Sequence, residues 1–298
     1  MVKQLEDLPE RYKAFYPYKE RPRQDGVFGV TEILYCLRKS FLTRVVPAPT
    51  AVDFEVRRRF ARGHASEAAF FGEKHNPLYV AGEGELKGLE GHTDHVVMDK
   101  DGKPQEIVEY KSTLRLWYKS PNGKSYYTKS YARKSTPKED WDNIVRTYND
   151  NHMDQLMLYM YMAGIPKGYL IYTEMSTDAN YIWEVDAADI TDEFKKRMAD
   201  RLNILRNAML DFKTPPRSSL YGWECALCTH NKHGVCDLCD APGFDLKAMC
   251  DKLKKDPSKY SDVVGKEIAN LGVAVEGDAV PEEDAENGDK VNGDSKEG

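Results

Sequence analysis

Two carboxylates and a lysine stand at spacings that could support metal-dependent hydrolysis. A Gly-x-x-Asp motif ends at Asp94, and a Glu-x-Lys motif follows with Glu109 and Lys111. Two ionised carboxylates a few ångströms apart repel each other, which favours a divalent cation between them. Ligands that offer only oxygen suit Mg²⁺ or Mn²⁺, which lower the pKa of a bound water and stabilise charge on a scissile phosphate. Lys111 would orient that water or neutralise the phosphate.

The strands that position these groups are predicted to form a hairpin. Glu109 and Lys111 share one face of a predicted strand at 106–112, because side chains alternate along a strand. The turn sequence Asp-Lys-Asp-Gly-Lys-Pro joins it to a predicted strand at 92–98, which carries Asp94. Alternating charges on a solvent-facing strand are a simpler explanation of Glu-x-Lys. The apolar pair before Glu109 and the nearby Asp94 favour a catalytic site instead.

A predicted helix at 150–163 carries Gln155 and Tyr159 one turn apart on a single face. Their neighbours are apolar all round, which indicates a buried helix. A buried glutamine needs a hydrogen-bond partner. That partner is the catalytic lysine, a metal-bound water or DNA if the residue is functional, and the protein backbone if it is structural.

Helical spacing also predicts helices at 31–43, which contains Cys36, and at 52–71. On the second helix, His64 and Glu67 lie on a stripe between phenylalanines. Polar groups on an apolar stripe are costly to bury unless something binds them. The remaining predicted elements are strands at 168–173 and 181–185 and a long helix at 191–212.

The cysteines near the end of the chain are spaced as metal ligands. Two Cys-x2-Cys pairs occur there, at Cys225, Cys228, Cys236 and Cys239. Such pairs commonly hold structural zinc, and His230 or His233 could replace one of the thiolates.

The segment that follows the catalytic strand is basic and aromatic. From 111 to 138 it has eight Lys or Arg, five aromatic residues and no Asp or Glu. Cations that follow phosphates and aromatic faces that stack bases are how proteins hold single strands, although a solvated surface insertion has the same composition. The candidate DNA-binding residues are Arg115, Trp117, Tyr118, Lys119, Lys124, Tyr126, Tyr127, Lys129, Tyr131, Arg133 and Lys134.

The 298-residue chain has a formal charge of −6 that is unevenly distributed. The end at 276–298 has nine acidic and two basic residues, so the remainder is close to neutral and can bind nucleic acid. With little to bury, that end is expected to be disordered. No apolar run approaches the ~20 residues that span a bilayer, and the charged N-terminus lacks a signal-peptide core. We therefore expect a cytoplasmic protein, in the host cytoplasm if it is viral.

In this order, Gly-x-x-Asp, Glu-x-Lys and Gln-x-x-x-Tyr resemble the RecB-like branch of the PD-(D/E)XK nuclease superfamily. Tyr35, Cys36 and Arg38, together with the distant cysteines, resemble the CRISPR-associated RecB-like exonuclease family, its iron–sulfur branch, which includes stand-alone viral and phage-type members. The resemblance covers about 31–240. It implies an α/β fold in which a mixed central sheet is flanked by helices and carries an iron–sulfur cap.

The resemblance also implies roles for single residues. The implied metal ligands are Asp94, Glu109 and the Tyr110 carbonyl; Lys111 is the implied catalytic lysine, and Gln155 and Tyr159 form the fourth motif. The family's first helix usually carries a histidine four residues after a glycine. Here Glu67 occupies that position after Gly63, and His64 lies one turn earlier. We therefore expect Glu67 as a further metal ligand, with His64 as the alternative.

On the same resemblance, Cys36, Cys225, Cys228 and Cys236 would bind a [4Fe–4S] cluster. The cluster would join segments 189 positions apart and serve the structure rather than electron transfer. Cys239 is the alternative fourth ligand, and Zn²⁺ is the alternative metal.

We expect a metal-dependent exonuclease that hydrolyses DNA at single-stranded ends, in CRISPR spacer acquisition or in recombination and repair. Its partners would be DNA and a CRISPR integrase complex or recombination proteins, and a homo-oligomer is compatible with the sequence. The alternatives are an endonuclease or flap nuclease of the same superfamily and a non-catalytic zinc-containing DNA-binding protein. The expected parts are an extension at 1–30, a nuclease domain at 31–245 with a cap from the first helix and 215–240, a helical piece at 246–275 and the tail at 276–298.

Overall fold

The computed structural model describes residues 25–47, 54–113, 117–119, 125–126, 145–147, 149–175, 178–218, 225 and 228–273. Backbone alone is described for 54–60, 117–119, 125–126 and 145–147. The chain divides into two compact units, one drawn from 1–34 and 50–207 and the other from 35–49 and 208–298. We call them the sheet unit and the cysteine unit.

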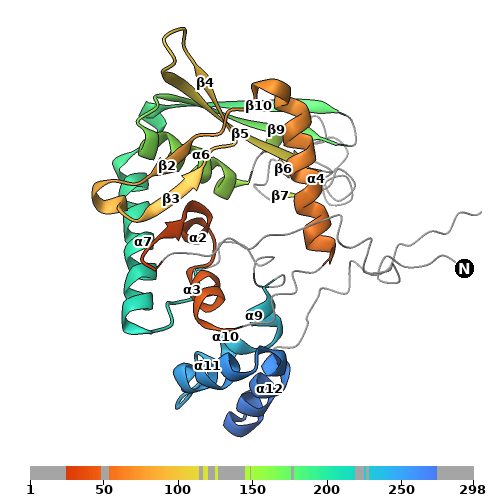
Figure 1. The fold of residues 1–298 in the computed structure, drawn as a ribbon, viewed down its shortest axis with the longest axis vertical. Coiled ribbons are helices and arrows are strands. Elements are labelled where there is room, and N and C mark those ends of the chain that lie inside the picture. Colours follow the sequence, from red (N-terminus) through yellow and green to blue (C-terminus); the bar gives the residue numbers. More distant parts are fainter. Residues whose placement is uncertain are drawn as a thin grey trace, which may run out of the picture. The chain divides into compact units, whose positions relative to one another are not determined.

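The sheet unit contains a four-stranded mixed sheet of order β10-β9-β5-β4 (Figure 1). Its strands are β4 (His95–Met98), β5 (Pro104–Thr113), β9 (Lys167–Glu174) and β10 (Ala179–Asp186). β5 and β9 are parallel, and the two outer pairs are antiparallel. The register places Glu109 beside Leu170 and Lys111 beside Tyr172, so these four side chains share one face of the sheet.

Helix α6 (Asp150–Ala163) packs on the face that carries Glu109 and Lys111. It comes close because Gly168 has no side chain: a Cβ there would lie 2.6 Å from Met160 Sδ and 2.8 Å from Leu156 Cδ1. The Asn149 side chain caps the start of the helix by accepting from the Asn151 N–H, and Gly164 ends it with a φ of 65°.

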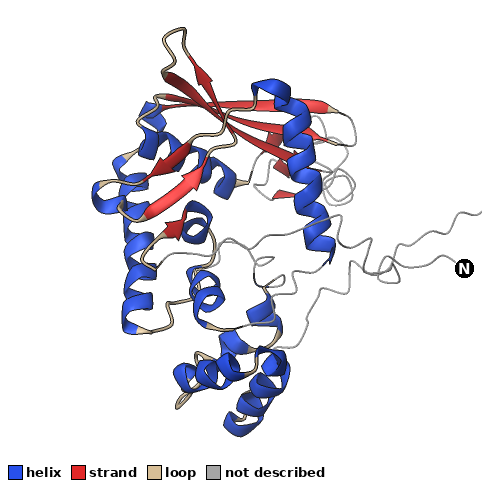
Figure 2. Ribbon diagram, viewed as in Figure 1, coloured by secondary structure: helices blue, strands red, loops and turns tan. Residues whose placement is uncertain are grey.

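Helix α4 (Phe54–Phe71) packs against the opposite face, where Tyr110 points. The rings of Phe70 and Phe71 lie 4.7 and 5.9 Å from that of Tyr110. Each of the two helices therefore covers one face of the sheet (Figure 2). Helix α7 (Asp192–Asp211) also belongs to this unit up to residue 207.

Smaller elements complete the sheet unit. A second sheet has the order β1-β3-β2, with strands β1 (Phe28–Gly29), β2 (Tyr79–Ala81) and β3 (Leu89–His92), and α2 (Val30–Leu34) follows β1. A third sheet has the order β7-β6-β8, with strands β6 (Trp117–Lys119), β7 (Ser125–Tyr126) and β8 (Val145–Thr147). The short 3₁₀ helices of this unit are η2 (Gly72–Lys74), η3 (Gly84–Leu86) and η5 (Ala187–Asp189).

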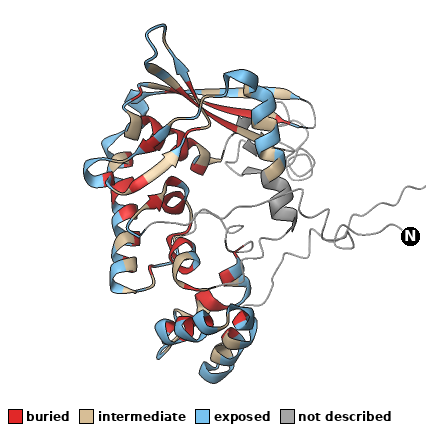
Figure 3. Ribbon diagram, in the orientation of Figure 1, coloured by how far each residue is buried: buried red, intermediate tan, exposed pale blue. Residues whose placement is uncertain are grey.

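The cysteine unit is helical within its described residues. Its helices are α3 (Leu37–Val45), α9 (Thr229–Lys232), α10 (Val235–Leu238), α11 (Leu246–Lys255), η6 (Pro257–Lys259) and α12 (Tyr260–Leu271). Val235, Leu238, Met249 and Leu253 are fully buried, and α12 packs against both α10 and α11. Figure 3 shows buried residues along these helices. Helices α11 and α12, which fall within the helical piece predicted at 246–275, belong to the same compact unit as the cysteines.

Two predicted elements are interrupted in the structure. The helix predicted at 31–43 is broken at Cys36, which has an extended ψ of 115°. The Leu37 N–H there donates to Ser218 Oγ at 2.9 Å, so α3 starts anew with a side-chain partner. The strand predicted at 92–98 is also broken, and Asp94 lies between β3 and β4 rather than within a strand.

Several predictions fall outside the described residues. The candidate DNA-binding residues Arg115, Lys124, Tyr127, Lys129, Tyr131, Arg133 and Lys134 lie there, as do the tail at 276–298 and most of the extension at 1–30. For Trp117, Tyr118, Lys119 and Tyr126 the structure describes the backbone alone. No helix in the described part of the chain is long and apolar enough to cross a membrane.

Candidate functional site

Asp94 lies at the edge of β5, at the point where pairing with β4 ends. The last paired residues are His95 and Val108. Beyond this pair, the Asp94 side chain rather than a backbone carbonyl of β4 binds the next free N–H of β5. Its Oδ2 accepts a hydrogen bond from the Tyr110 N–H at 2.8 Å. In a strand, the N–H and C=O of one residue point to the same side. The Tyr110 carbonyl therefore points toward the side on which Asp94 lies.

Glu109 is completely buried, and it contacts the Lys111 ammonium through Oε1. Burial raises the pKa of Glu109 to about 8; Lys111 opposes that rise and the nearby Asp94 carboxylate adds to it. Its second oxygen, Oε2, is buried and makes no hydrogen bond in the described structure. A buried carboxyl oxygen without a partner is costly, and a bound cation or water at this position would supply one.

Lys111 lies between the two carboxylates. Its Nζ donates to Glu109 Oε1 and is 3.7 Å from Asp94 Oδ2. Burial alone would lower the pKa of Lys111, but Glu109 and Asp94 outweigh it and the pKa is raised. The lysine is therefore a permanent cation at neutral pH.

Gln155 and Tyr159 lie on the face of α6 that covers this group. Both are buried, and Gln155 Nε2 donates to the Tyr159 hydroxyl at 3.3 Å. Burial, with the charge of Glu109, raises the pKa of Tyr159. The Tyr159 ring lies against Gly91, where a Cβ would be 2.5 Å from Cε1. The glycine of Gly-x-x-Asp is therefore required by the tyrosine of Gln-x-x-x-Tyr.

The first-helix candidates Glu67 and His64 lie on α4, the helix that packs against the face of the sheet opposite to Glu109 and Lys111. Glu67 Oε1 is 2.9 Å from His75 Nε2, and its Oε2 is 3.8 Å from His64 Nδ1. The His64 side chain is 82% exposed. His75 had no signal in the sequence, because it lies outside the helix in the loop before β2.

The donors fit a divalent cation that keeps part of its water shell. In the described part of the chain, no three His, Cys, Asp or Glu side chains are grouped closely enough to hold a metal ion as they stand. Asp94 and Glu109 can offer two carboxylates and Tyr110 a carbonyl, which leaves water to complete the coordination. Mg²⁺ is commonly held in this way, by one or two carboxylates and several waters.

His152 is a further polar residue of α6 that the sequence reasoning missed. It lies three residues before Gln155 and seven before Tyr159, so all three share one face of the helix. The spacing was visible in the sequence.

Four cysteines of the cysteine unit line one cavity. Its lining comprises Cys36, Lys39, Arg217, Cys225, Cys228, Asn231 and Cys236. Cys239 and Cys250 are not part of that lining. The hydrogen bond between Cys228 and Cys236 lowers the pKa of Cys228 and raises that of Cys236, so the pair loses its first proton more readily than its second.

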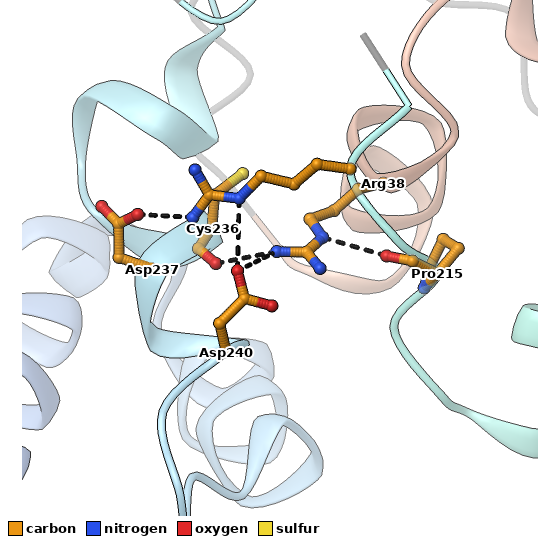
Figure 4. Close-up of polar contacts among 6 residues, drawn as sticks. Arg38, Pro215, Cys236, Asp237 and Asp240 are labelled. Atoms are coloured by element: carbon orange, nitrogen blue, oxygen red, sulfur yellow. Dashed lines mark hydrogen bonds and ion pairs between the residues drawn. The ribbon is translucent and has the colours of Figure 1, made fainter.

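Arg38 holds the cavity's surroundings together (Figure 4). Its buried guanidinium donates to the carbonyls of Pro215 at 2.9 Å and Cys236 at 3.0 Å, and pairs with Asp240 at 2.7 Å. Arg217 pairs with Asp237 and, at 3.2 Å, with the same Asp240. The arginine of the Tyr-Cys-x-Arg sequence thus binds the backbone of a cysteine that is 198 positions away.

His230 is placed for hydrogen bonding rather than for a metal. Its Nε2 is 3.4 Å from Thr43 Oγ1, and its Nδ1 is 3.2 Å from the Tyr260 hydroxyl. Burial, together with Lys39 and His233, lowers the pKa of His230 to about 4. With both ring nitrogens near hydroxyl groups, His230 is a neutral structural histidine.

Comparison with known proteins gives distant likenesses. No protein-family model matches the chain, and no curated protein matches it in sequence. The crystal structure of SSO0001 is similar over 70% of this chain and 86% of its own, at 15% identity and a TM-score of 0.41. The alkaline exonuclease LHK-Exo from Laribacter hongkongensis is similar over 68% of this chain and 96% of its own, at 11% identity and a TM-score of 0.34, or 0.36 for its complex with dAMP. These values are too low to establish a shared fold, so the chemistry of the site rests on its own geometry.

Proposed function

We propose that this protein is a metal-dependent nuclease that hydrolyses phosphodiester bonds of DNA. The observation that carries the proposal is the completely buried Glu109, whose Oε2 has no donor in the described structure. Asp94 and Lys111 lie beside it. A fold rarely buries a carboxylate next to another one unless the pair serves binding or catalysis.

Asp94, Glu109 and the Tyr110 carbonyl would hold Mg²⁺ or Mn²⁺, with Glu67 or His64 as a further ligand. When bound, the cation supplies Lewis acidity and a water of lowered pKa. Lys111 stays protonated between the carboxylates, so it donates hydrogen bonds to the phosphate or the attacking water and does not accept a proton. Gln155 and Tyr159 would fix helix α6 over the site, through their mutual hydrogen bond and through the contact of Tyr159 with Gly91.

We further propose that the enzyme is an exonuclease acting at single-stranded DNA ends, guided by the basic aromatic segment at 111–138. Its biological role would be CRISPR spacer acquisition or recombination and repair. The family resemblance of the motifs supports this part of the proposal.

In the cysteine unit, Cys36, Cys225, Cys228 and Cys236 would bind a [4Fe–4S] cluster. A cluster takes one thiolate on each of four irons and so needs its cysteines around a cavity rather than at a single point. The shared cavity of these four residues supports them over Cys239.

The test is hydrolysis of end-labelled single- and double-stranded DNA with Mg²⁺, with Mn²⁺ and with EDTA. Lys111→Ala is compared with Lys196→Ala, which removes an exposed lysine of α7 paired to Asp200. We expect stepwise shortening that requires metal, is lost in Lys111→Ala and persists in Lys196→Ala. DNA binding without cleavage, in protein with its cysteine-bound metal intact, would contradict the proposal and favour a DNA-binding protein.

A further inference from the structure

His152 stands at the edge of the candidate site, in the first turn of helix α6. On α6 it shares a face with Gln155 and Tyr159, and that helix packs on β5 and β9. Its neighbour in β9 is Tyr172, which the register places beside Lys111. His152 and Lys111 therefore lie on the same side of the sheet.

The imidazole is held by one nitrogen. His152 Nδ1 is hydrogen-bonded to the Tyr172 hydroxyl, which also accepts from the Asn149 N–H at 3.2 Å. When the Tyr172 O–H donates to Nδ1, the neutral imidazole carries its proton on Nε2. Within the described part of the chain Nε2 makes no hydrogen bond, and the residue is only half-buried. In this tautomer an oriented Nε2–H is available to a ligand.

The imidazole is also uncharged. Burial of part of the ring and the positive charge of Lys111 hold the pKa of His152 below its usual range. At neutral pH the site accordingly combines one cation, Lys111, with one neutral donor. This combination suits a phosphodiester, which carries a single negative charge and has two non-bridging oxygens.

We propose that His152 binds a non-bridging phosphate oxygen of the DNA substrate through its Nε2–H, beside the bond to be cleaved. The inference rests on the proposed nuclease function and adds to it a substrate-contacting residue outside the motifs that the sequence singled out. Tyr172 is the positioning residue that orients the ring.

Three substitutions separate this contact from a structural role. In Gln the side-chain NH₂ group lies near the position of Nε2, whereas in Asn it lies near that of Nδ1. We expect His152→Gln to retain most of the kcat/KM on single-stranded DNA. His152→Asn and His152→Ala should lose about 10- to 100-fold, the range for one hydrogen bond to a charged group. Thermal unfolding of each variant provides the folding control.

A modified substrate locates the contact. Methylphosphonate linkages, which remove the charge and one oxygen, are introduced one at a time around the cleavage position. When the contacted linkage is modified, the kcat/KM of the wild type should fall to that of His152→Ala on unmodified DNA. The kcat/KM of His152→Ala itself should fall little further. Equal losses for the Gln, Asn and Ala variants, or losses that ignore the position of the modification, would overturn the proposal.

If the wild type cleaves no DNA, the nuclease function fails but the contact can still be measured. Binding of the same modified strands is then followed by fluorescence anisotropy in EDTA. The contact is supported if His152→Ala binds the strands more weakly than the wild type, except for the one strand whose methylphosphonate removes the contacted oxygen. Identical affinities of the two proteins for every strand refute it.

Discussion

Glu109 is a carboxyl group that the fold has removed from water, and its Oε1 accepts from the Lys111 ammonium. Removing a carboxylate from water costs several kcal/mol even after relaxation. The pKa of about 8 shows that Lys111 offsets only part of this cost. The residue is thus held ready to lose its proton when a second cation arrives.

This balance predicts a pH-dependent stability. The folded-state pKa of Glu109 is raised from 4.5 to about 8, so between these values the folded chain keeps a proton that the unfolded chain has lost. Its contribution to the free energy of unfolding therefore falls as pH rises through this window. Glu109→Gln cannot ionise and escapes the penalty.

In EDTA, we expect the melting temperature of Glu109→Gln minus that of the wild type to grow from pH 5 to pH 8. Each kcal/mol corresponds to roughly 2–4 °C for a chain of this size. His152, which titrates in the opposite sense, is present in both proteins and cancels. A difference that stays constant with pH would show that Glu109 is already ionised in the folded protein.

At the scale of elements, α6 both packs the sheet and closes the candidate site. Leu156 and Met160 fit over Gly168, while Gln155 and Tyr159 face the carboxylates. Gly168 and Gly91 allow this close approach, because the methyl group of an alanine at either position would displace the helix.

Gly91→Ala should therefore weaken the protein and the site together. Its Cβ would lie 2.5 Å from the Tyr159 ring, and overpacking of this kind costs about 1–3 kcal/mol. We expect a lower free energy of urea unfolding and a loss of cleavage. Gly63→Ala on α4 is the matched control, because its Cβ meets nothing within 4 Å and alanine favours a helix by about 1 kcal/mol. If both variants were equally stable, the contact between Tyr159 and Gly91 would be disproved.

Arg38 has the same importance for α3 in the cysteine unit. Arg38→Met would leave the buried carbonyls of Pro215 and Cys236 without their donor, at about 1–3 kcal/mol each. We expect reduced stability and reduced iron per chain. Lys255→Met, an exposed position on α11, should change neither quantity. Full iron content in Arg38→Met would show that the cavity forms without the hydrogen bonds of Arg38.

At the scale of the whole molecule, the chain enters the cysteine unit twice. Residues 35–49 leave the sheet unit early, and 208–298 return to the cysteine unit at the end. A metal centre that takes Cys36 together with Cys225, Cys228 and Cys236 would join these passages covalently. Such a link stabilises mainly by restricting the unfolded chain, as closing any long loop does.

The ligand set can be read from metal content. We expect anaerobically purified wild type to contain iron and sulfide and to show the visible absorption of a cluster. Cys36→Ser should lose both, and Cys239→Ser should retain them, because Cys239 does not line the cavity. Zinc in the wild type, with loss in Cys239→Ser and not in Cys36→Ser, would instead identify the compact zinc site.

Local pattern alone was enough for the elements that carry the site. Alternation of side chains predicted the strand that became β5 and placed Glu109 and Lys111 on one face. Helical spacing predicted α4 and α6 within a few residues. The turn predicted from Asp-Lys-Asp-Gly-Lys-Pro lies between β4 and β5. In it, Asp99 accepts from the Lys103 N–H at 2.8 Å and Gly102 has a positive φ. These features depend on neighbours in the chain, which a sequence displays directly.

What only the tertiary structure decided is which distant group satisfies each buried polar atom. The sequence placed Asp94 within a strand, whereas its carboxylate binds the Tyr110 N–H beyond the end of β4. It predicted an unbroken helix through Cys36, whereas Ser218 starts a new one at Leu37. It did not connect Glu67 with His75 or Gly91 with Tyr159. Such pairings follow from the register and packing of elements far apart in the chain, and periodicity carries no information about either.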